Sequence, residues 1–481
     1  MFQFEFGTDH YHHIHFIGIG GISMSGLAAL MLSKGYSISG SDQKTSSITD
    51  HLKDLGITVY EGHDPSNIKG ADLIVYTDAI HMDNPEYRAA VQQKIDIVDR
   101  ATFLGAIMRN FHVSIAVSGT HGKTTTTSMI ATAIKDAPFS PTIMVGGNLG
   151  EISGNVRIGT GDFFLTEACE YRANVLKYFP STAIILNIDE DHLDFFDNID
   201  HILDTFRKYA GNLGEGDTLI LNKDDEKAYS MREATKANIV TISIKSDADY
   251  IAKNIAVDPE TGHTSYDLVI RGKDCGHIAM RVMGLHNITN SLAAIAACVE
   301  NGVAIEDAVK GVQSYHGVGR RLEFKGVLGY HGVGRRLDYK GEVNGIRVID
   351  DYAHHPTEIA STLHALKPTV SNRLICIFQP HTYTRTKLLL DSFSHSFKES
   401  DITIIADIYA AREKDYGDIH SKTLVEAVKA NHDQALYIGE QDGILDYIMK
   451  KSRPGDVILT MGAGDIYRVG ERFLENYEPQ K

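Results

Sequence analysis

The sequence predicts an α/β protein built of three domains. Segments with the apolar character of buried strands alternate with helical segments along the chain, and two glycine-rich loops each follow such a strand. The length of 481 residues corresponds to roughly three domains of about 150 residues. We expect parallel sheets covered by helices on both faces, Rossmann-like in the first and third domains, with a P-loop domain between them. The expected bounds are 1–108, 109–326 and 327–481.

The first domain is predicted from an alternating series of short segments. Its expected helices are 25–34 and 102–108. Apolar residues flanked by glycine or polar turns mark the strands, which we place at 15–20, 36–40, 71–76 and 95–98.

The second and third domains repeat this alternation. In the second domain, residues 238–283 are rich in strand-forming residues and predict a small antiparallel layer, and 291–300 predicts a helix. The other strands expected in the second domain are 112–117, 163–166, 183–186 and 218–221. Those expected in the third are 347–349, 374–378, 402–406 and 457–460.

Composition excludes several classes of protein. The formal net charge of −16 argues against a nucleic-acid-binding protein, which usually presents a basic face. The four cysteines are scattered without a C-x-x-C pair, as expected of reduced thiols. Histidines occupy the N-terminus where a secretion signal needs an apolar run, and no apolar stretch is long enough to cross a membrane. These features predict a cytoplasmic protein without a membrane anchor, and they leave monomer and dimer open.

The phosphate loop is the strongest chemical signal. A strand leads into Gly119-Thr120-His121-Gly122-Lys123-Thr124, and a helix is expected to begin near Thr125. Backbone N–H groups of such a loop bind phosphate oxygens, the lysine neutralises the β- and γ-phosphates, and the threonine hydroxyl ligates Mg²⁺. Two residues separate Gly119 from Gly122, where the usual pattern has four. The alternative is a strand-to-helix turn without ligand, but the Lys-Thr pair in this context favours ATP binding.

A second glycine loop lies near the N-terminus. It contains Gly18, Gly20, Gly21 and Gly26, and Asp42 ends the next strand. This arrangement favours a bound nucleotide diphosphate with Asp42 on a ribose. Ser23 occupies the place of the third fingerprint glycine, so a tight turn without ligand is the alternative.

Polar side chains follow several other expected strands. Glu167 and His192 lie just beyond strand ends, where ligands collect in parallel sheets, and could hold a second divalent ion. Taken singly, each is more commonly a surface residue. The remaining polar segments are Gly284 to Asn290, with His286 and Asn287; Asp350 to Pro356, with Asp351, His354 and His355; and Gln379 to Arg385, with His381. The histidines near residue 13 more commonly lie at a surface than bind a metal.

A short internal repeat precedes the third domain. Residues 315–326 return almost unchanged as 330–341, each copy containing Gly-Val-Gly-Arg-Arg. A repeat present only twice is no solenoid, which needs three or more units. We interpret it as a local tandem duplication at a domain junction.

Taken in order, these segments resemble the Mur ligases of bacterial cell-wall synthesis. The resemblance covers nearly the whole chain and rests on residues 15–26, residues 119–127, His286 and the segments around Asp351 and His381. It implies ATP-dependent joining of L-alanine to the carboxylate of UDP-N-acetylmuramate through an acyl phosphate, with ATP and Mg²⁺ as cofactors. The three domains would bind the UDP-sugar, ATP and the amino acid, in that order.

The resemblance also implies roles for individual residues. The UDP-sugar would contact Gly18, Gly20, Gly21, Ser23, Met24, Ser25 and Asp42, and alanine would contact His355, His381 and Arg385. His121 would be a further substrate-binding residue. ATP would contact residues 119–125, His286, Asn287 and Asn290, and the metal ligands would be Thr124, Glu167 and His192. The catalytic set would be Lys123, His192, Asn287, Arg336 and Asp351.

Three departures from the family pattern affect these assignments. Thr382 stands where some relatives have arginine, which places more of alanine recognition on Arg385. The segment around Glu170 is less acidic than in other members, which leaves the role of Glu170 open. The second Gly-Val-Gly-Arg-Arg copy runs uninterrupted into Asp351, so the functional arginine is assigned to Arg336, with Arg321 as the alternative.

Three other functions are compatible with parts of the sequence. A sister ligase that attaches a recycled tripeptide to the same UDP-sugar would share nearly every ATP-site residue. A nicotinamide-dependent oxidoreductase would explain the first glycine loop but not Lys123 and Thr124. A non-catalytic nucleotide-binding regulator would show no turnover that depends on an acceptor amine.

Overall fold

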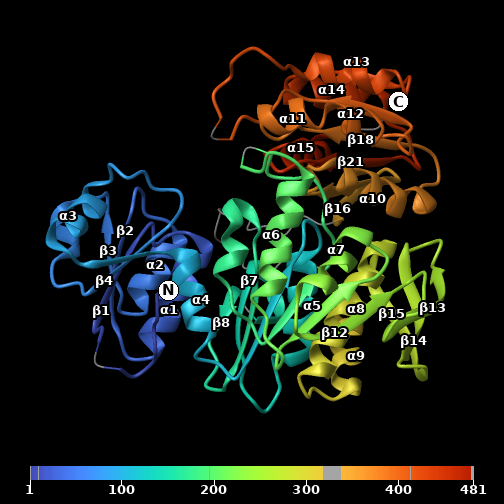
Figure 1. Cartoon of the computed structure of the whole chain (residues 1–481). Helices are drawn as coiled ribbons and strands as arrows, with labels where there is room; N and C mark the ends of the chain where they lie inside the picture. The colour runs from blue at the N-terminus through green and yellow to red at the C-terminus, as the bar shows by residue number, and fades with distance from the viewer. Residues whose placement is uncertain are drawn as a thin grey trace.

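The computed structural model describes residues 2–8, 10–152, 154–193, 195–317, 337–411 and 413–477, which form three sheets with their helices. Figure 1 shows the first sheet beside the second and the third above it. The first sheet is parallel throughout, in the Rossmann-like order β3-β2-β1-β4-β5. Its strands are β1 (His13–Ile17), β2 (Ser37–Asp42), β3 (Thr58–Glu61), β4 (Leu73–Tyr76) and β5 (Asp96–Asp99). Its helices are α1 (Ile22–Ser33), α2 (Ser47–Asp54), α3 (Pro85–Gln93) and α4 (Arg100–Met108).

The central sheet has ten strands in the order β15-β14-β13-β12-β11-β10-β6-β9-β7-β8. The strands of its parallel part are β6 (Val113–Ser118), β7 (Thr142–Leu149), β9 (Phe163–Glu167), β10 (Thr182–Ile185), β11 (Thr218–Asn222), β12 (Asn238–Ser243) and β13 (Tyr250–Val257). Antiparallel strands complete both edges: β8 (Gly154–Arg157), β14 (His263–Ile270) and β15 (Lys273–Met283). Its helices are α5 (Lys123–Ile134), α6 (Ile199–Gly211), α7 (Glu226–Ser230), α8 (Leu285–Glu300) and α9 (Ile305–Ser314). The expected antiparallel layer is therefore a continuation of this sheet.

The third sheet has the order β16-β17-β21-β18-β19-β20 and is parallel except for the β16–β17 pair. Its strands are β16 (Asp338–Val343), β17 (Ile346–Asp351), β18 (Leu374–Phe378), β19 (Ile402–Ile405), β20 (Ala435–Tyr437) and β21 (Val457–Met461). Its helices are α10 (Pro356–Leu366), α11 (Tyr383–Leu388), α12 (Leu390–Ser394), α13 (Ser421–Lys429), α14 (Gln441–Lys451) and α15 (Tyr467–Asn476). The α/β class and the Rossmann-like first and third sheets agree with the prediction.

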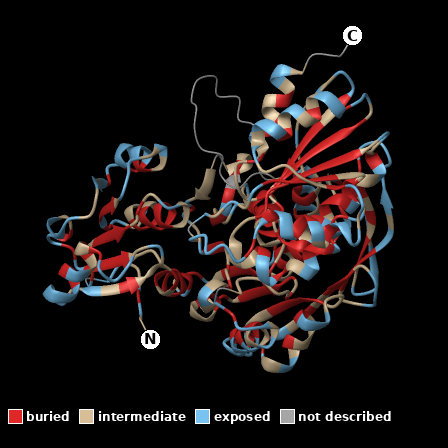
Figure 2. Ribbon diagram, turned by 90° about the horizontal axis from the view of Figure 1, so that it is seen from above, coloured by how far each residue is buried: buried red, intermediate tan, exposed pale blue. Residues whose placement is uncertain are grey.

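Apolar packing joins the first two sheets. One core runs from Phe16 and Leu27 of the first sheet and its helices to Phe164 and Phe206 of the central one. Figure 2 shows the strands of each sheet as buried and the outer helix faces as exposed. Glycine allows the closest approach: a Cβ on Gly105 of α4 would lie 1.8 Å from the Lys177 carbonyl oxygen.

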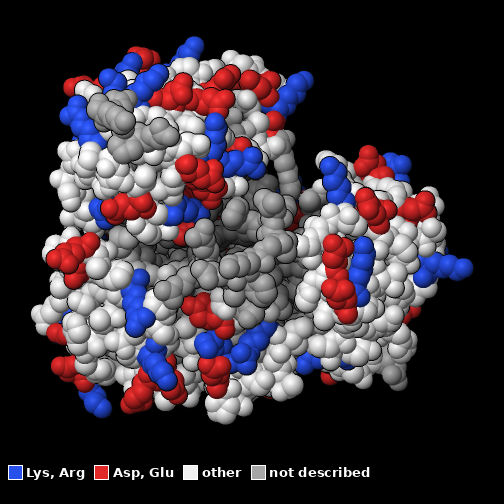
Figure 3. All heavy atoms as spheres, turned by 180° about the vertical axis from the view of Figure 1, so that it is seen from behind, with Lys and Arg blue, Asp and Glu red and all other residues white. Residues whose placement is uncertain are grey.

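The surface seen in Figure 3 carries acidic and basic side chains interspersed over all three parts of the molecule. Among the residues that the structure describes, no helix combines the length and apolar character needed to span a bilayer.

Candidate active site

The phosphate loop adopts the strand–loop–helix geometry that its sequence predicts. It leaves β6 at Ser118 and enters α5 at Lys123. Gly119 has φ +124° and Gly122 has φ +86°, a region that side chains with a Cβ rarely occupy. A Cβ on Gly119 would also lie 3.0 Å from the Asn187 carbonyl oxygen. Both glycines are therefore required by the backbone.

The segment that follows β10 holds this loop in place. The backbone N–H of His121 donates to Asn187 Oδ1 at 2.8 Å, and Asn187 Nδ2 donates to the His121 carbonyl at 3.0 Å. The Asp189 N–H donates to Thr120 Oγ1 at 2.8 Å. These bonds hold the phosphate loop against the segment after β10.

Lys123 is held over the loop. Its ammonium donates to the carbonyls of Gly119 at 2.6 Å and Thr120 at 3.0 Å, and it pairs with Glu170 at 3.0 Å. Burial alone would lower the pKa of Lys123, but the charge of Glu170 outweighs burial and raises that pKa. The lysine is therefore cationic, and phosphate oxygens could take the place of the carbonyls and of Glu170.

Two carboxylates and an imidazole lie beside the lysine. Thr124 Oγ1 donates to Glu167 Oε2 at 3.1 Å, and the Gly146 N–H donates to Glu167 Oε1 at 2.7 Å. Burial raises the pKa of Glu167. His192 Nε2 lies 3.7 Å from Glu170 Oε1, so the structure places Glu170 between Lys123 and His192. A hydroxyl with two carboxylates is a donor set that suits Mg²⁺.

The start of α8 packs against the phosphate loop. Asn290 lies so near Gly122 that a Cβ there would be 2.6 Å from Asn290 Oδ1. Asn287 orients this residue, because Asn290 Nδ2 donates to Asn287 Oδ1 at 2.9 Å while Asn287 Nδ2 donates to the Met283 carbonyl. His286 lies in the same turn of α8. Three residues predicted near ATP thus lie at the loop or on the helix turn beside it.

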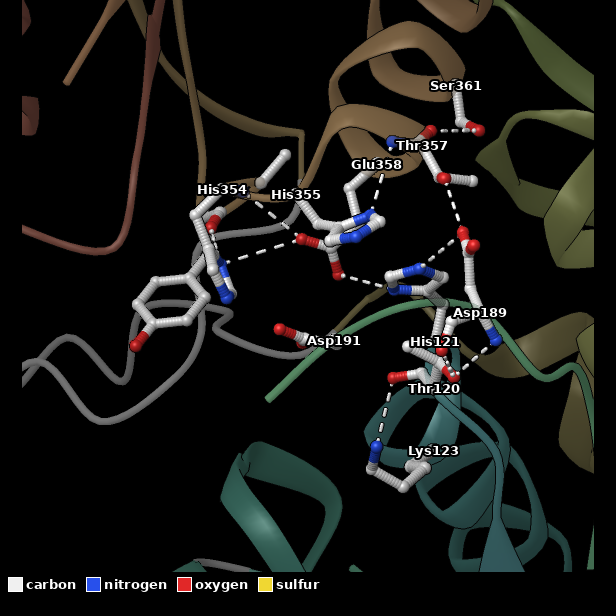
Figure 4. Close-up of polar contacts among 12 residues, drawn as sticks. Thr120, His121, Lys123, Asp189, Asp191, His354, His355, Thr357, Glu358 and Ser361 are labelled. Carbon is white, nitrogen blue, oxygen red and sulfur yellow. Dashed lines mark hydrogen bonds and ion pairs between the residues drawn. The ribbon is translucent and has the colours of Figure 1, made fainter. Parts of the chain in front are cut away.

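The third domain meets the phosphate loop through charged contacts, drawn in Figure 4. His121 lies between Asp189 at 3.5 Å and Glu358 of α10 at 3.4 Å. Burial works against the charged imidazole, but these carboxylates raise the pKa of His121 to about 9. Thr357 Oγ1 also donates to Asp189, at 2.6 Å. His121 therefore joins two domains as a cation.

His355 belongs to the same set of contacts. Its Nε2 lies 2.7 Å from the Glu190 carbonyl, and its Nδ1 accepts from the Thr357 N–H at 3.3 Å. His121, Asp189 and His355 lie close enough together to hold a metal ion. Against that interpretation, both ring nitrogens of His355 already make hydrogen bonds.

Arg385 crosses the same junction. Its Nε and Nη2 donate to Asp191 Oδ1 at 3.3 and 3.1 Å, and its Nη1 donates to His381 Nδ1 at 3.2 Å. The His381 ring stacks on Tyr409. Burial lowers the pKa of His381 to about 4, and the same effect lowers that of His354 to about 4. Both imidazoles are therefore neutral near pH 7.

Asp351 ends β17 and is buried. Its Oδ1 accepts from the Ala353 N–H and its Oδ2 from the Leu337 N–H, both at 2.7 Å. Arg336, and with it the choice between Arg336 and Arg321, lies outside the described residues. Of the two junction residues in the predicted catalytic set, the structure therefore describes Asp351 and not Arg336.

The N-terminal glycine loop is shaped by the end of β2. The N–H groups of Gly18 and Ile19 donate to the Ser41 carbonyl, and the Gly20 N–H donates to Asp42 Oδ2 at 2.9 Å. Asp42 thus stabilises the loop by a hydrogen bond. The prediction that Asp42 contacts a ribose did not include this interaction. Gly21 precedes α1 as its N-cap.

The side chains that follow in α1 face different surroundings. Met24 packs in the core, and the Ser25 hydroxyl donates to the Ile22 carbonyl. Ser23 Oγ accepts from Arg100 Nη1 at 3.3 Å. Sequence reasoning did not place Arg100 next to this glycine loop. Arg100 begins α4 and is far from the loop along the chain.

Sequence reasoning also missed the acidic partners at the junction. Asp189 and Asp191 lie in the segment that drew attention to His192, and an acidic run directly after a strand was a usable signal. Glu358 lies in the first turn of α10, where acidic residues are common because they interact favourably with the helix dipole. Its contact with His121 depends on how two domains meet.

Comparison with protein families covers most of the chain. The family described as "Mur ligase family, catalytic domain" matches residues 13–112. "Mur ligase middle domain" matches 117–298, and "Mur ligase, glutamate ligase domain" matches 335–464.

Individual relatives are similar over nearly their whole length. The UDP-N-acetylmuramate–L-alanine ligase of Acetivibrio thermocellus is 46% identical over 467 residues, covering 97% of this chain and 96% of the relative. That of Clostridium botulinum strain Hall is 46% identical over 472 residues, covering 98% and 99%.

Solved structures agree with this similarity. The UDP-N-acetylmuramate–alanine ligase of Thermotoga maritima superposes with a TM-score of 0.73 at 28% identity, covering 97% of this chain and 99% of that one. A murein peptide ligase of Psychrobacter arcticus has a TM-score of 0.67 at 25% identity, with coverage of 96% and 98%.

Proposed function

This chain belongs to the Mur ligase family, and we propose that it joins L-alanine to the carboxylate of UDP-N-acetylmuramate in peptidoglycan synthesis, converting ATP to ADP and phosphate. The observation that carries the proposal is the convergence of three elements at one place. The phosphate loop with Lys123, the carboxylates after β9 and Arg385 of the third domain all meet around the segment after β10. The alanine-ligase relatives, at 46% identity, support the choice of amino acid.

The first chemical step needs cancellation of negative charge. A carboxylate and the γ-phosphate of ATP repel each other, so Lys123 and the loop N–H groups would neutralise the phosphate while the carboxylate attacks it. Thr124, Glu167 and His192 would hold Mg²⁺, with Glu170 near enough to take part, and the ion would add positive charge beside the transferring group. The acyl phosphate formed carries a good leaving group.

The second step brings an amine to that acyl phosphate. Arg385 would bind the alanine carboxylate through its planar fork, with His381 and His355 beside it. The neutral amine attacks the carbonyl carbon and phosphate leaves. Contact between α10 and the phosphate loop would exclude water, which otherwise hydrolyses the intermediate.

Each domain and the other predicted site residues have a place in this reaction. Residues 1–108 would bind the UDP-sugar at the glycine loop, 109–326 would bind ATP, and 327–481 would bind alanine. Asn287, Asn290 and His286 would approach the adenine and the reacting groups. Asp351 and Arg336 would complete the ATP site, and the reaction would take place in the cytoplasm.

Phosphate release from ATP tests the function directly. With Mg²⁺ and UDP-N-acetylmuramate present, release should require L-alanine and yield the alanyl product by mass. Lys123→Ala should abolish it, whereas Lys236→Ala, at an exposed position of the same domain, should not. An enzyme that ignores alanine and uses the tripeptide L-alanyl-γ-D-glutamyl-meso-diaminopimelate instead would be a peptide ligase, and the alanine assignment would be withdrawn.

A further inference from the structure

Arg385, the proposed receptor for the alanine carboxylate, is paired with an aspartate from the other side of the junction. Asp191 Oδ1 accepts from both Nε and Nη2 of Arg385. The two side chains are only 12% and 14% exposed, so this is a largely desolvated contact between domains. Figure 4 shows Asp191 on the loop that also carries Asp189, facing residues of the third domain.

Asp191 also points toward the phosphate site. Its second oxygen, Oδ2, lies 3.9 Å from His192 Nε2. His192 in turn lies 3.7 Å from Glu170, which pairs with Lys123 at 3.0 Å. Asp191 therefore stands between the arginine that would hold alanine and the lysine that would hold the γ-phosphate.

A small pocket opens at this position. Asp191 and Arg385 supply one negative and one positive group to its wall, and Leu193 and Leu389 supply apolar surface. Free alanine carries a carboxylate, an ammonium group and a methyl group on one carbon atom. The wall of this pocket offers a partner of matching chemistry for each of the three.

On the basis of the proposed function, we propose that Asp191 binds the α-ammonium group of alanine while Arg385 binds its carboxylate. Without the amino acid the two side chains pair with each other, which keeps both charges compensated. Alanine inserts between them, and each side chain exchanges one charged partner for another. The amino group is then held on the side of the pocket that faces His192 and Lys123, where the acyl phosphate forms. It releases one proton to solvent before its nitrogen attacks as the neutral amine.

Another acid of the pocket fits this role less well. Glu413 also lines the wall, where its Oε2 accepts from the Thr384 N–H at 2.9 Å, much as Asp191 Oδ1 accepts from the His192 N–H at 2.7 Å. The difference is that Glu413 makes its bond at the start of α11, within the third domain. Asp191 comes from the central domain and is the acid of this wall that lies next to His192.

Steady-state kinetics of Asp191→Asn test the proposal. We expect KM for alanine to rise about 10- to 100-fold, the effect of losing one charge-assisted hydrogen bond, with KM for ATP and UDP-N-acetylmuramate changed less than about 3-fold. Glu190→Gln, which removes a carboxylate from the same loop, is the matched control and should leave all three KM values within that range. Thermal unfolding and ATP binding verify that the variant is folded.

Inhibition by propionate separates recognition of the ammonium group from mere support of Arg385. Propionate has the carboxylate but no amine, so Asp191→Asn should leave its inhibition constant unchanged or improve it. Equal weakening of alanine and propionate would overturn the proposal, because Asp191 would then only position Arg385. An unchanged KM for alanine in the variant would overturn it as well.

The parent enzyme distinguishes failure of this inference from failure of the proposed function. If the parent turns over alanine and Asp191→Asn behaves like the parent, only the inference fails. If the parent uses the tripeptide instead, the alanine function fails, and the same comparison is made between the tripeptide and its N-acetylated form as an inhibitor. Loss of discrimination between these two in Asp191→Asn would support ammonium recognition, and retained discrimination would overturn it.

Discussion

The central domain meets its two neighbours through junctions of different character. Toward the first domain the contact is mainly apolar: one core crosses the junction, and α1 packs so closely that a Cβ on Gly26 would lie 2.4 Å from Val156. One ion pair, Lys177 with Asp99 at 2.8 Å, also crosses this junction. Toward the third domain the contact includes His121 with Glu358 and Arg385 with Asp191. Apolar packing has no charged partner to exchange, whereas ion pairs can exchange partners with charged substrates. We infer that the junction with the third domain is the one that responds to binding of charged substrates.

The largest expected effect breaks the apolar junction. Gly105→Ala places a Cβ 1.8 Å from the Lys177 carbonyl oxygen, which is backbone and cannot rotate away. We expect a loss above about 4 kcal/mol, more than the usual ~1–3 for overpacking, although alanine is the better helix former. Thermal unfolding of Gly105→Ala against Gly216→Ala, where nothing lies within 4 Å, measures the difference. Equal melting temperatures would show that the junction is loosely packed.

A smaller effect is expected from the buried pair of Lys123 and Glu170, which lies next to the polar junction. Glu170→Gln leaves the Lys123 ammonium without its carboxylate, and removing one partner of a buried pair costs about 3 kcal/mol or more. ATP should restore part of this stability, because its phosphates replace the lost negative charge. The shift in melting temperature on adding Mg²⁺-ATP should therefore be larger in Glu170→Gln than in the parent. A smaller shift would mean that Glu170 itself helps to bind the nucleotide.

The polar junction should depend on pH through His121. The pKa of His121 is raised from 6.5 to about 9, so its ion pairs contribute stability that is complete below pH 6.5 and is lost as the pH rises through about 9. Melting temperature should fall across this range by about 1–3 °C more in the parent than in His121→Gln. Parallel curves of melting temperature against pH for the two proteins would show that the His121 ion pairs do not stabilise the polar junction.

The smallest effect tests one exposed contact at the edge of that junction. Thr357→Val keeps the shape of the side chain but removes the hydroxyl that donates to Asp189 at 2.6 Å. We expect a change of about 1 kcal/mol or less and KM values for alanine and ATP within about 5-fold of the parent. Abolished turnover would assign Thr357 a place in the reaction itself.

Features of the fold that depend on a few neighbouring residues could be predicted from the sequence. The apolar run 374–378 is β18 residue for residue, and the glycines that permit the turn at Gly119 and Gly122 predicted the phosphate loop. Short or exposed strands were missed, because β3 and β16 carry polar residues on largely solvent-facing positions. The layer expected at 238–283 joined the central sheet, since pairing of β12 with β11 is a long-range property.

The site divides in the same way. Lys123 and Thr124 act within one loop, so their neighbours could be read from the chain. Asp191 and Arg385 are 194 positions apart, and their pairing exists only because two domains meet. Arg100 reaches Ser23 across 77 positions within the first domain, where the fold brings the start of α4 beside α1. Contacts of both kinds depend on how folded elements and domains pack, which no single segment encodes.

The transfer of heavy oxygen from substrate to phosphate tests directly whether an acyl phosphate forms. UDP-N-acetylmuramate labelled in its carboxylate oxygens would be turned over with ATP and L-alanine, and the released phosphate analysed by mass. We expect each phosphate to carry one labelled oxygen, because the carboxylate attacks the γ-phosphate and amide formation expels that oxygen with it. Unlabelled phosphate from a reaction that still forms the alanyl product would contradict the acyl-phosphate mechanism.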